Sequence, residues 1–139
     1  MFSKSNLLAS LAGGIFLFFG GYLVWGELMT DFFAQHTGSA IGVQKETPEF
    51  LFLAIGCLLE AFFMTAIYSK WSGGVHSGSG GFKFGALLGA LFGFGEYFIW
   101  FATSNLSDLT GSLVAGVVNV IFIGITGAII ALVCRATSK

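Results

Sequence analysis

Residues 81–103 read GFKFGALLGALFGFGEYFIWFAT, and this stretch decides the fold class. It is slightly longer than the ~20 residues that a helix needs to cross a bilayer, and its only charged residues are Lys83 and Glu96. Apolar and polar residues do not alternate as a half-buried strand would require, and an open sheet cannot satisfy its backbone in lipid. The stretch therefore predicts a membrane-spanning helix.

Three further apolar runs of similar length cover 7–29, 48–69 and 109–133. Together the four runs predict an all-α integral membrane four-helix bundle, up-down-up-down, forming a single transmembrane domain over residues 1–139. The composition agrees, because 55% of the chain is hydrophobic and 9% is charged, against roughly 25% charged residues in soluble domains. The first run is too long for the apolar part of a signal peptide, so we interpret it as a retained helix.

The basic residues predict the orientation of the bundle. Cytoplasmic flanks of membrane helices carry an excess of Lys and Arg. Only Lys45 falls on one side of the predicted bundle, and the other five fall on the opposite side: Lys4, Lys70, Lys83, Arg135 and Lys139. Both termini and the loop 70–80 are therefore expected in the cytoplasm. We expect a flexible linker over 70–80, and a short interfacial helix through Phe32 and Phe33 in the outer loop 30–47.

Glycine recurs at every fourth position of the third run, as in a glycine zipper. Small residues let membrane helices approach closely, so this stripe predicts a helix contact, and Gly116 lies on a looser small face of the fourth run. The stripe could pack within the chain or face another subunit, and the sequence leaves both open. Its members are Gly81, Gly85, Gly89 and Gly93.

Acidic and amide side chains lie inside the predicted spans, whereas Lys and Arg stay near their ends. Counting residues from the outer ends places Glu60 and Asn119 near the midplane, with Glu96 a turn or so shallower. Helical phase places Glu96 on the glycine stripe, and all three are expected in helix contacts. Glu27, near the outer end of the first run, is expected to be interfacial.

An ionised carboxylate inside hydrocarbon is costly, so Glu60 and Glu96 need a proton, water or a cation. One interpretation is a neutral Glu60 hydrogen-bonded to Asn119 as a structural polar core. The other is a proton or cation site.

The sequence contains no catalytic Ser/His/Asp arrangement, paired-cysteine motif or zinc-protease motif, and its loops have few polar groups for an active site. The predicted topology puts His36 and His76 on opposite sides of the membrane, as solvated loop residues that cannot share a metal. We therefore expect no enzymatic activity, no cofactor and no metal. The net charge of −1 offers no basic surface to nucleic acid.

The segments Thr103-Ser104-Asn105-Leu106 and Val117-Val118-Asn119-Val120 carry a family resemblance. The chain resembles small bacterial four-helix membrane proteins, a domain of unknown function, with a Thr-Asn-Leu turn after the third helix. In that family an acid or amide lies midway down the fourth helix, where Asn119 stands here. Ala102 stands near the place of a family Asp. The resemblance implies a bacterial inner-membrane protein.

Two functions follow as expectations. The first is a non-catalytic membrane subunit whose glycine-rich faces pack into a larger membrane complex or a homo-oligomer. The alternative is a small proton- or cation-coupled transporter or channel that uses Glu60 and Glu96. In both, the lipid bilayer surrounds the chain.

Overall fold

The computed structural model describes residues 3–138, and four of its helices are long and apolar enough to cross a membrane. This confirms the all-α fold and the four helices that could span a membrane, as in a multi-pass membrane protein. The first span comprises α1 (Lys4–Gly21) and η1 (Tyr22–Leu28), and a short α2 (Thr30–Gln35) follows. The others are α3 (Phe50–Trp71); α4 (Gly78–Ala90) with η2 (Leu91–Glu96) and α5 (Tyr97–Thr103); and α6 (Leu109–Thr137).

Local signals explain where the helices begin. The predicted interfacial helix is α2. Helix α4 begins at Gly78, earlier than expected, because the Ser77 hydroxyl accepts a hydrogen bond from the Gly80 N–H at 3.0 Å. Helix α3 begins at Phe50, two residues later than expected, and no side chain caps it.

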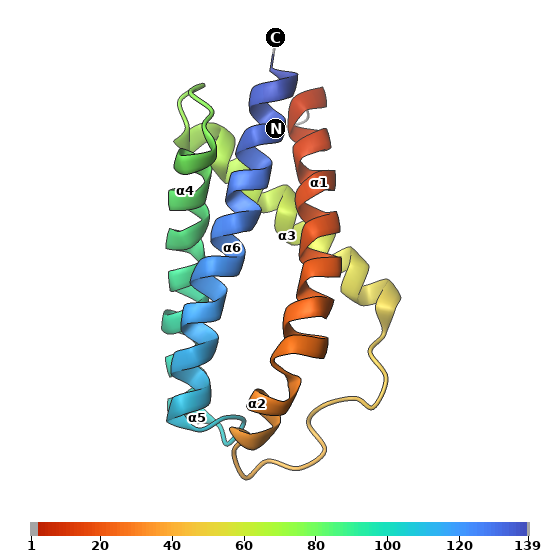
Figure 1. Ribbon diagram of the computed structural model, residues 1–139, viewed down its shortest axis with the longest axis vertical. Coiled ribbons are helices and arrows are strands. Elements are labelled where there is room, and N and C mark those ends of the chain that lie inside the picture. Colours follow the sequence, from red (N-terminus) through yellow and green to blue (C-terminus); the bar gives the residue numbers. More distant parts are fainter. Residues whose placement is uncertain (1–2, 139) are drawn as a thin grey trace.

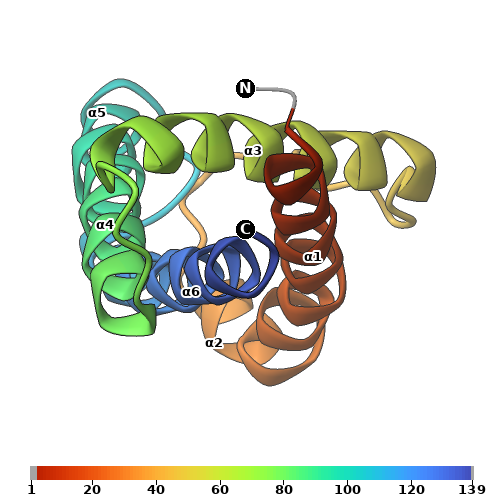
Figure 2. The ribbon, with the colours of Figure 1, turned by 90° about the horizontal axis from the view of Figure 1, so that it is seen from above.

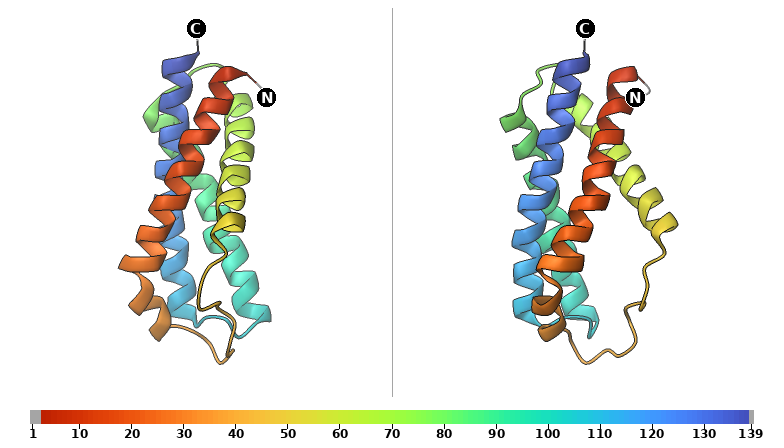
Figure 3. Two further views of the ribbon diagram at one scale, coloured as in Figure 1. Left: turned by 90° about the vertical axis from the view of Figure 1, so that its right-hand side faces the viewer. Right: turned by 45° about the vertical axis from the view of Figure 1, so that its right-hand side comes forward.

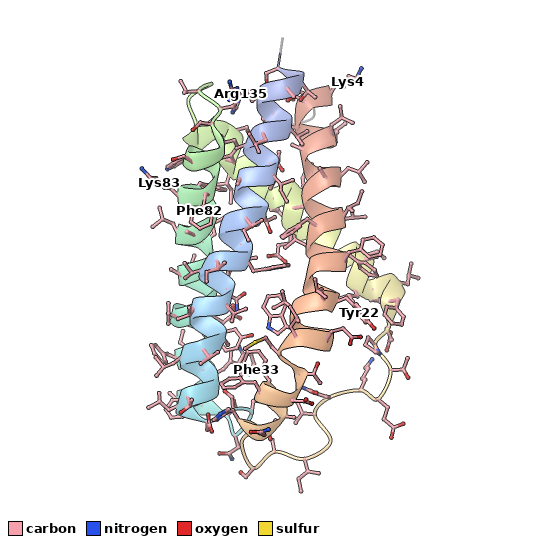
Figure 4. All side chains as sticks on the ribbon, viewed as in Figure 1. Lys4, Tyr22, Phe33, Phe82, Lys83 and Arg135 are labelled. Carbon is pink, nitrogen blue, oxygen red and sulfur yellow. The ribbon has the colours of Figure 1, made fainter. Side chains whose placement is uncertain are left out.

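Both described chain ends lie at one end of the molecule, and α2 with the turn after α5 lies at the other, which we call the loop end (Figure 1). The basic residues Lys4, Lys83 and Arg135 lie towards the chain ends (Figure 4). Lys45 is the one basic residue that the sequence predicts on the opposite side of the bundle. It is exposed and pairs with Glu49. Lys139, which was part of the predicted charge asymmetry, lies outside the described residues.

The span formed by α4, η2 and α5 packs antiparallel against α6. A Cβ added to Gly81, Gly85 or Gly89 would overlap backbone oxygens of α6, and one on Gly93 would lie 2.8 Å from the Gly116 oxygen. Backbone therefore touches backbone along the whole stripe. The glycine stripe faces α6 of the same chain and leaves no room for another subunit there.

Helix α3 lies obliquely to the other three spans (Figures 1 and 2). Its second half packs chiefly on α1 and buries Ala61, Met64, Thr65 and Tyr68. Its first half diverges from the bundle, so that side chains such as Leu51 and Phe52 are about 70% and 67% exposed within the protein. The divergence from α1 is visible from two further directions (Figure 3).

Candidate functional site

Two π-helical segments interrupt the spans, one in each half of the chain. They begin 69 positions apart, at Tyr22 and Leu91. The same offset relates two aromatic-Gly-Glu triplets, Trp25-Gly26-Glu27 and Phe94-Gly95-Glu96, each within a π segment. Single π turns inside α-helices are frequent at functional sites. The two halves of the chain therefore share a local plan: a long helix with a π segment near its end, followed by a second long helix.

The π segment of the third span changes the direction in which Glu96 points. A π turn contains more residues than an α turn, so side chains beyond it lose the phase of the preceding helix. Gly93 still contacts α6, but Glu96 lines a cavity at the loop end. The expectation that Glu96 lies in the helix contact of the glycine stripe is therefore wrong.

This loop-end cavity has a volume of about 570 Å³ and lies between η1, α2, the 36–49 loop, η2 with α5, and the start of α6. Four aromatic side chains and one carboxylate dominate its lining. Phe33, one of them, is seen at the loop end in Figure 4. The lining comprises Trp25, Thr30, Phe33, Ala34, His36, Thr37, Gln44, Glu96, Tyr97, Trp100, Leu106, Ser107, Gly111 and Ala115.

Glu96 is the only acidic side chain in that lining, and the lining holds neither Lys nor Arg. The indole Nε1–H of Trp100 points towards its carboxylate, with 3.4 Å between nitrogen and oxygen. That long contact leaves most of the acceptor capacity of the carboxylate open to the cavity.

A clasp between the loop and the start of α6 closes the cavity on one side. The backbone pairs antiparallel, because Gly38 N–H donates to the Leu106 oxygen at 3.1 Å and Asp108 N–H donates to the His36 oxygen at 3.0 Å. The His36 Nδ1 lies 2.8 Å from the Asp108 carboxylate. His36 is thus half-buried and bonded, so the prediction of a solvated loop histidine is wrong. No motif in the sequence indicates that the 36–40 segment pairs with 105–108.

Asp108 holds the clasp to the helix as well. Its carboxylate caps α6 by accepting a hydrogen bond from Gly111 N–H at 2.7 Å. That bond, followed by the bond to His36, lowers the pKa of Asp108 from its ordinary value, because both favour the charged form. Asp108 is thus the N-cap residue of α6.

A second cavity of about 480 Å³ is the cleft between α1 with η1 and the diverging half of α3, with α6 as its floor. Glu60 and Asn119 both line it, beside Trp25, which also lines the loop-end cavity. The rest of the lining is mostly apolar: Leu17, Phe18, Gly21, Tyr22, Gly26, Pro48, Phe50, Leu53, Cys57, Phe122 and Ile123.

Glu60 and Asn119 share the cleft without bonding to each other. The Asn119 amide donates to the Ala115 oxygen at 2.9 Å, one turn earlier in its own helix. Within residues 3–138 the Glu60 carboxylate makes neither a hydrogen bond nor an ion pair. The expected placement of Glu60 in a helix contact is therefore wrong, because the first half of α3 stands away from α6. Of the two interpretations of Glu60, the hydrogen bond to Asn119 is absent from the structure of residues 3–138.

Glu27 is arranged differently from the other two acids. Its carboxylate accepts a hydrogen bond from the Tyr22 hydroxyl at 2.7 Å, and it is not among the residues that line either cavity. Glu27 and Glu96 occupy equivalent positions in the two halves of the chain, yet only Glu96 faces a cavity.

Sequence reasoning missed the aromatic residues of the loop-end cavity and both π segments. The aromatic-Gly-Glu triplet repeated at Trp25 and Phe94 is a signal for the π segments, but of the cavity aromatics it contains Trp25 alone. Among the described residues, no group of three or more His, Cys, Asp or Glu side chains could hold a metal ion.

Comparisons of the chain with protein-family models, with curated proteins and with solved structures gave no significant match. The family resemblance drawn from the turn at Asn105 therefore stays a prediction. Function has to be argued from the two cavities and their carboxylates.

Proposed function

We propose that this protein is a small cation- or proton-coupled transporter that uses Glu60 and Glu96. The observation that carries the proposal is the position of Glu60. It lies midway along α3, on an open cleft, and no cation within residues 3–138 pairs with it.

The position of Glu60 is significant because a charge in hydrocarbon is costly. A carboxylate at the centre of a span is expensive unless it takes up a proton, meets water or binds a cation. A structural acid would be expected to be hydrogen-bonded to its neighbours, and Glu60 is not. An acid that is left open towards a cleft can take up and release a cation, as coupling sites in transporters require.

The shared plan of the two halves supports the same proposal. Many transporters consist of two structural repeats and bind their substrate where the repeats meet. The loop-end cavity takes Trp25 from the first π segment and Glu96 from the second, so both halves contribute to it. The cleft adjoins it through Trp25.

For the membrane setting we propose that both termini lie in the cytoplasm, as the charge asymmetry favours. The loop end then faces outwards. The resemblance of the sequence favours the inner membrane of a bacterium as the location.

Transport can be tested in proteoliposomes that contain a pH dye, with proton flux and ²²Na⁺ uptake recorded after a gradient is applied. We expect flux above that of empty liposomes, and a loss of most of it in Glu60→Gln and Glu96→Gln. Glu46→Gln, which changes an exposed loop acid, is the matched control and should keep the flux. Equal flux in the wild type and both span variants would refute the proposal.

A second candidate is a non-catalytic membrane subunit, and the same cleft is the observation that favours it. A partner helix that packs beside the cleft could place a Lys or Arg side chain between α1 and α3 and neutralise Glu60. The glycine stripe cannot be the surface that binds a partner, because α6 of the same chain packs against it. Purification from the native membrane in mild detergent tests this candidate: a stoichiometric partner supports it, and a lone monomer counts against it.

A further inference from the structure

We propose that the loop-end cavity is a binding site for an organic ammonium group, such as a quaternary amine. This inference deepens the proposed function by naming the class of solute, and in that respect it rests on it. The site itself is argued from the side chains that line the cavity.

The first argument is the aromatic lining. Four aromatic residues from three elements border one cavity: Trp25 from η1, Phe33 from α2, and Tyr97 and Trp100 from α5. The faces of aromatic rings attract cations, and Trp is the strongest of them. Cages of several aromatic rings are the usual means by which proteins recognise quaternary ammonium ions, which cannot donate hydrogen bonds.

The second argument is charge. Glu96 contributes the one carboxylate of the lining, and its only hydrogen bond, from Trp100, is long. No cationic side chain competes for it: Lys45 pairs with Glu49, and the Nδ1 of His36 faces the carboxylate of Asp108. A bound cation would therefore contact the aromatic rings of the lining and also the Glu96 carboxylate, which no cationic side chain neutralises.

The third argument is size and access. A volume of about 570 Å³ lies within the range of small-molecule sites, roughly 300–1,000 Å³, and exceeds what a metal ion or a proton needs. Residues of the 36–49 loop line the cavity, so we expect it to lie near the membrane surface. The ammonium group could therefore belong to a free solute or to the headgroup of a choline lipid. The chemistry recognised is the same in both cases.

Tryptophan fluorescence offers a direct test on the full chain. Of the three tryptophans, Trp25 and Trp100 line the cavity and Trp71 ends α3. In a Trp71→Phe background the emission therefore comes from the two cavity tryptophans, of which Trp25 also borders the cleft. The probe is choline, and 3,3-dimethyl-1-butanol is its uncharged counterpart of the same shape. We expect choline to change the emission saturably in lipid-free detergent and the alcohol to bind at least tenfold more weakly.

Variants assign the site to its residues. Glu96→Gln should weaken choline binding about tenfold or more, and Trp100→Leu should weaken it while leaving the protein monodisperse. Glu27→Gln changes the equivalent acid of the other half and should leave binding unchanged. Equal binding of the alcohol, unchanged binding in Glu96→Gln, or no choline binding by folded wild type would each overturn the proposal.

Lipid nanodiscs separate the two sources of the ammonium group. Choline binding in phosphatidylglycerol discs that disappears in phosphatidylcholine discs assigns the cavity to the lipid headgroup. Binding in both kinds of disc assigns it to a free solute. Both results support an ammonium site.

Uptake of radiolabelled choline into proteoliposomes separates this inference from the transport proposal. Choline binding with neither choline uptake nor proton or sodium flux would leave the site standing and refute transport. Proton or sodium flux in the wild type that is lost in Glu60→Gln and Glu96→Gln, together with an absence of choline binding, would leave transport standing and refute the site.

Discussion

Asp108 joins the loop at His36 to the start of α6 through three hydrogen bonds. It caps α6 through Gly111, it bonds His36 from the opposite loop, and its own N–H donates to the His36 backbone. An exposed acid with a single neighbour contributes little, but here two hydrogen bonds converge on the charged form. The ionised form of Asp108 therefore contributes to the contact between the loop and α6, beside the backbone hydrogen bonds.

The pKa of Asp108 can be measured by NMR, because Asp31 is the only other aspartate in the chain. Since the folded state lowers the pKa of Asp108, the stabilisation is complete above the unfolded value of about 3.9 and is lost as the pH falls through the folded value. In ¹³C-labelled protein we expect Asp108 to titrate below the same residue in a peptide of residues 104–112.

His36→Ala serves as the control for that titration. It should raise the pKa of Asp108 only part of the way, because the bond from Gly111, the larger cause, remains. If the pKa of Asp108 in the wild-type protein equals that in the peptide, the clasp does not form in solution.

The contacts of single residues were less predictable from the sequence than the helices. The sequence pointed to Glu60, Glu96 and Asn119, because charged and amide groups are rare in spans. It did not show that Glu60 would be left without a partner, since this depends on the tilt of a whole helix. It also did not show the pairing of His36 with Asp108, which are 72 positions apart.

The glycine stripe of α4 and η2 acts at the scale of helices. Gly85 touches the Ile123 carbonyl and the Gly124 Cα of α6, whereas Gly56 of α3 has no atom within 4 Å of where a Cβ would stand. Backbone contact of this kind is the main source of attraction between helices in lipid, where apolar burial gives no advantage.

Gly85→Ala should destabilise the protein by about 1–3 kcal/mol, because a methyl group would force α4 away from α6. Gly56→Ala, in open space, should be neutral or slightly stabilising, since Ala favours a helix. Thermal unfolding of both variants in the same detergent, followed by circular dichroism, measures the difference. Equal transition temperatures for the two variants would contradict the close packing of α4 on α6.

Helices were predictable where they depend on composition and less so where they depend on geometry. Long apolar runs marked all four spans, and the aromatic pair Phe32-Phe33 marked α2. The π segments could not be read from hydropathy, because a π turn changes helical phase and leaves apolarity unaltered. The oblique α3 is likewise invisible in sequence, since tilt follows from packing against neighbours.

At the scale of the molecule, five of the six basic residues predict that both termini face the cytoplasm. With Cys57 and Cys134 replaced by serine, Ser39→Cys should react with a membrane-impermeant maleimide in intact cells. Ser138→Cys should react only after the cells are permeabilised. The reverse pattern would invert the proposed orientation, and labelling of both in intact cells would contradict a common side for the chain ends.

The oblique α3 also fixes where water must reach. Because α3 starts partway along the molecule, the non-helical residues 41–49 run beside the bundle to meet it (Figures 1 and 3). Open backbone of this kind is not tolerated in hydrocarbon. We therefore infer that the hydrocarbon boundary passes near Phe50, and labelling of Thr47→Cys by the same aqueous reagent checks this.

Helix α6, with 29 residues, is about 44 Å long and exceeds a hydrocarbon layer of about 30 Å. Its first turns, together with η2 and α5, would then extend beyond that boundary into the headgroup layer. A charged solute could enter the loop-end cavity laterally from the headgroup layer. It would reach Glu96 without crossing hydrocarbon.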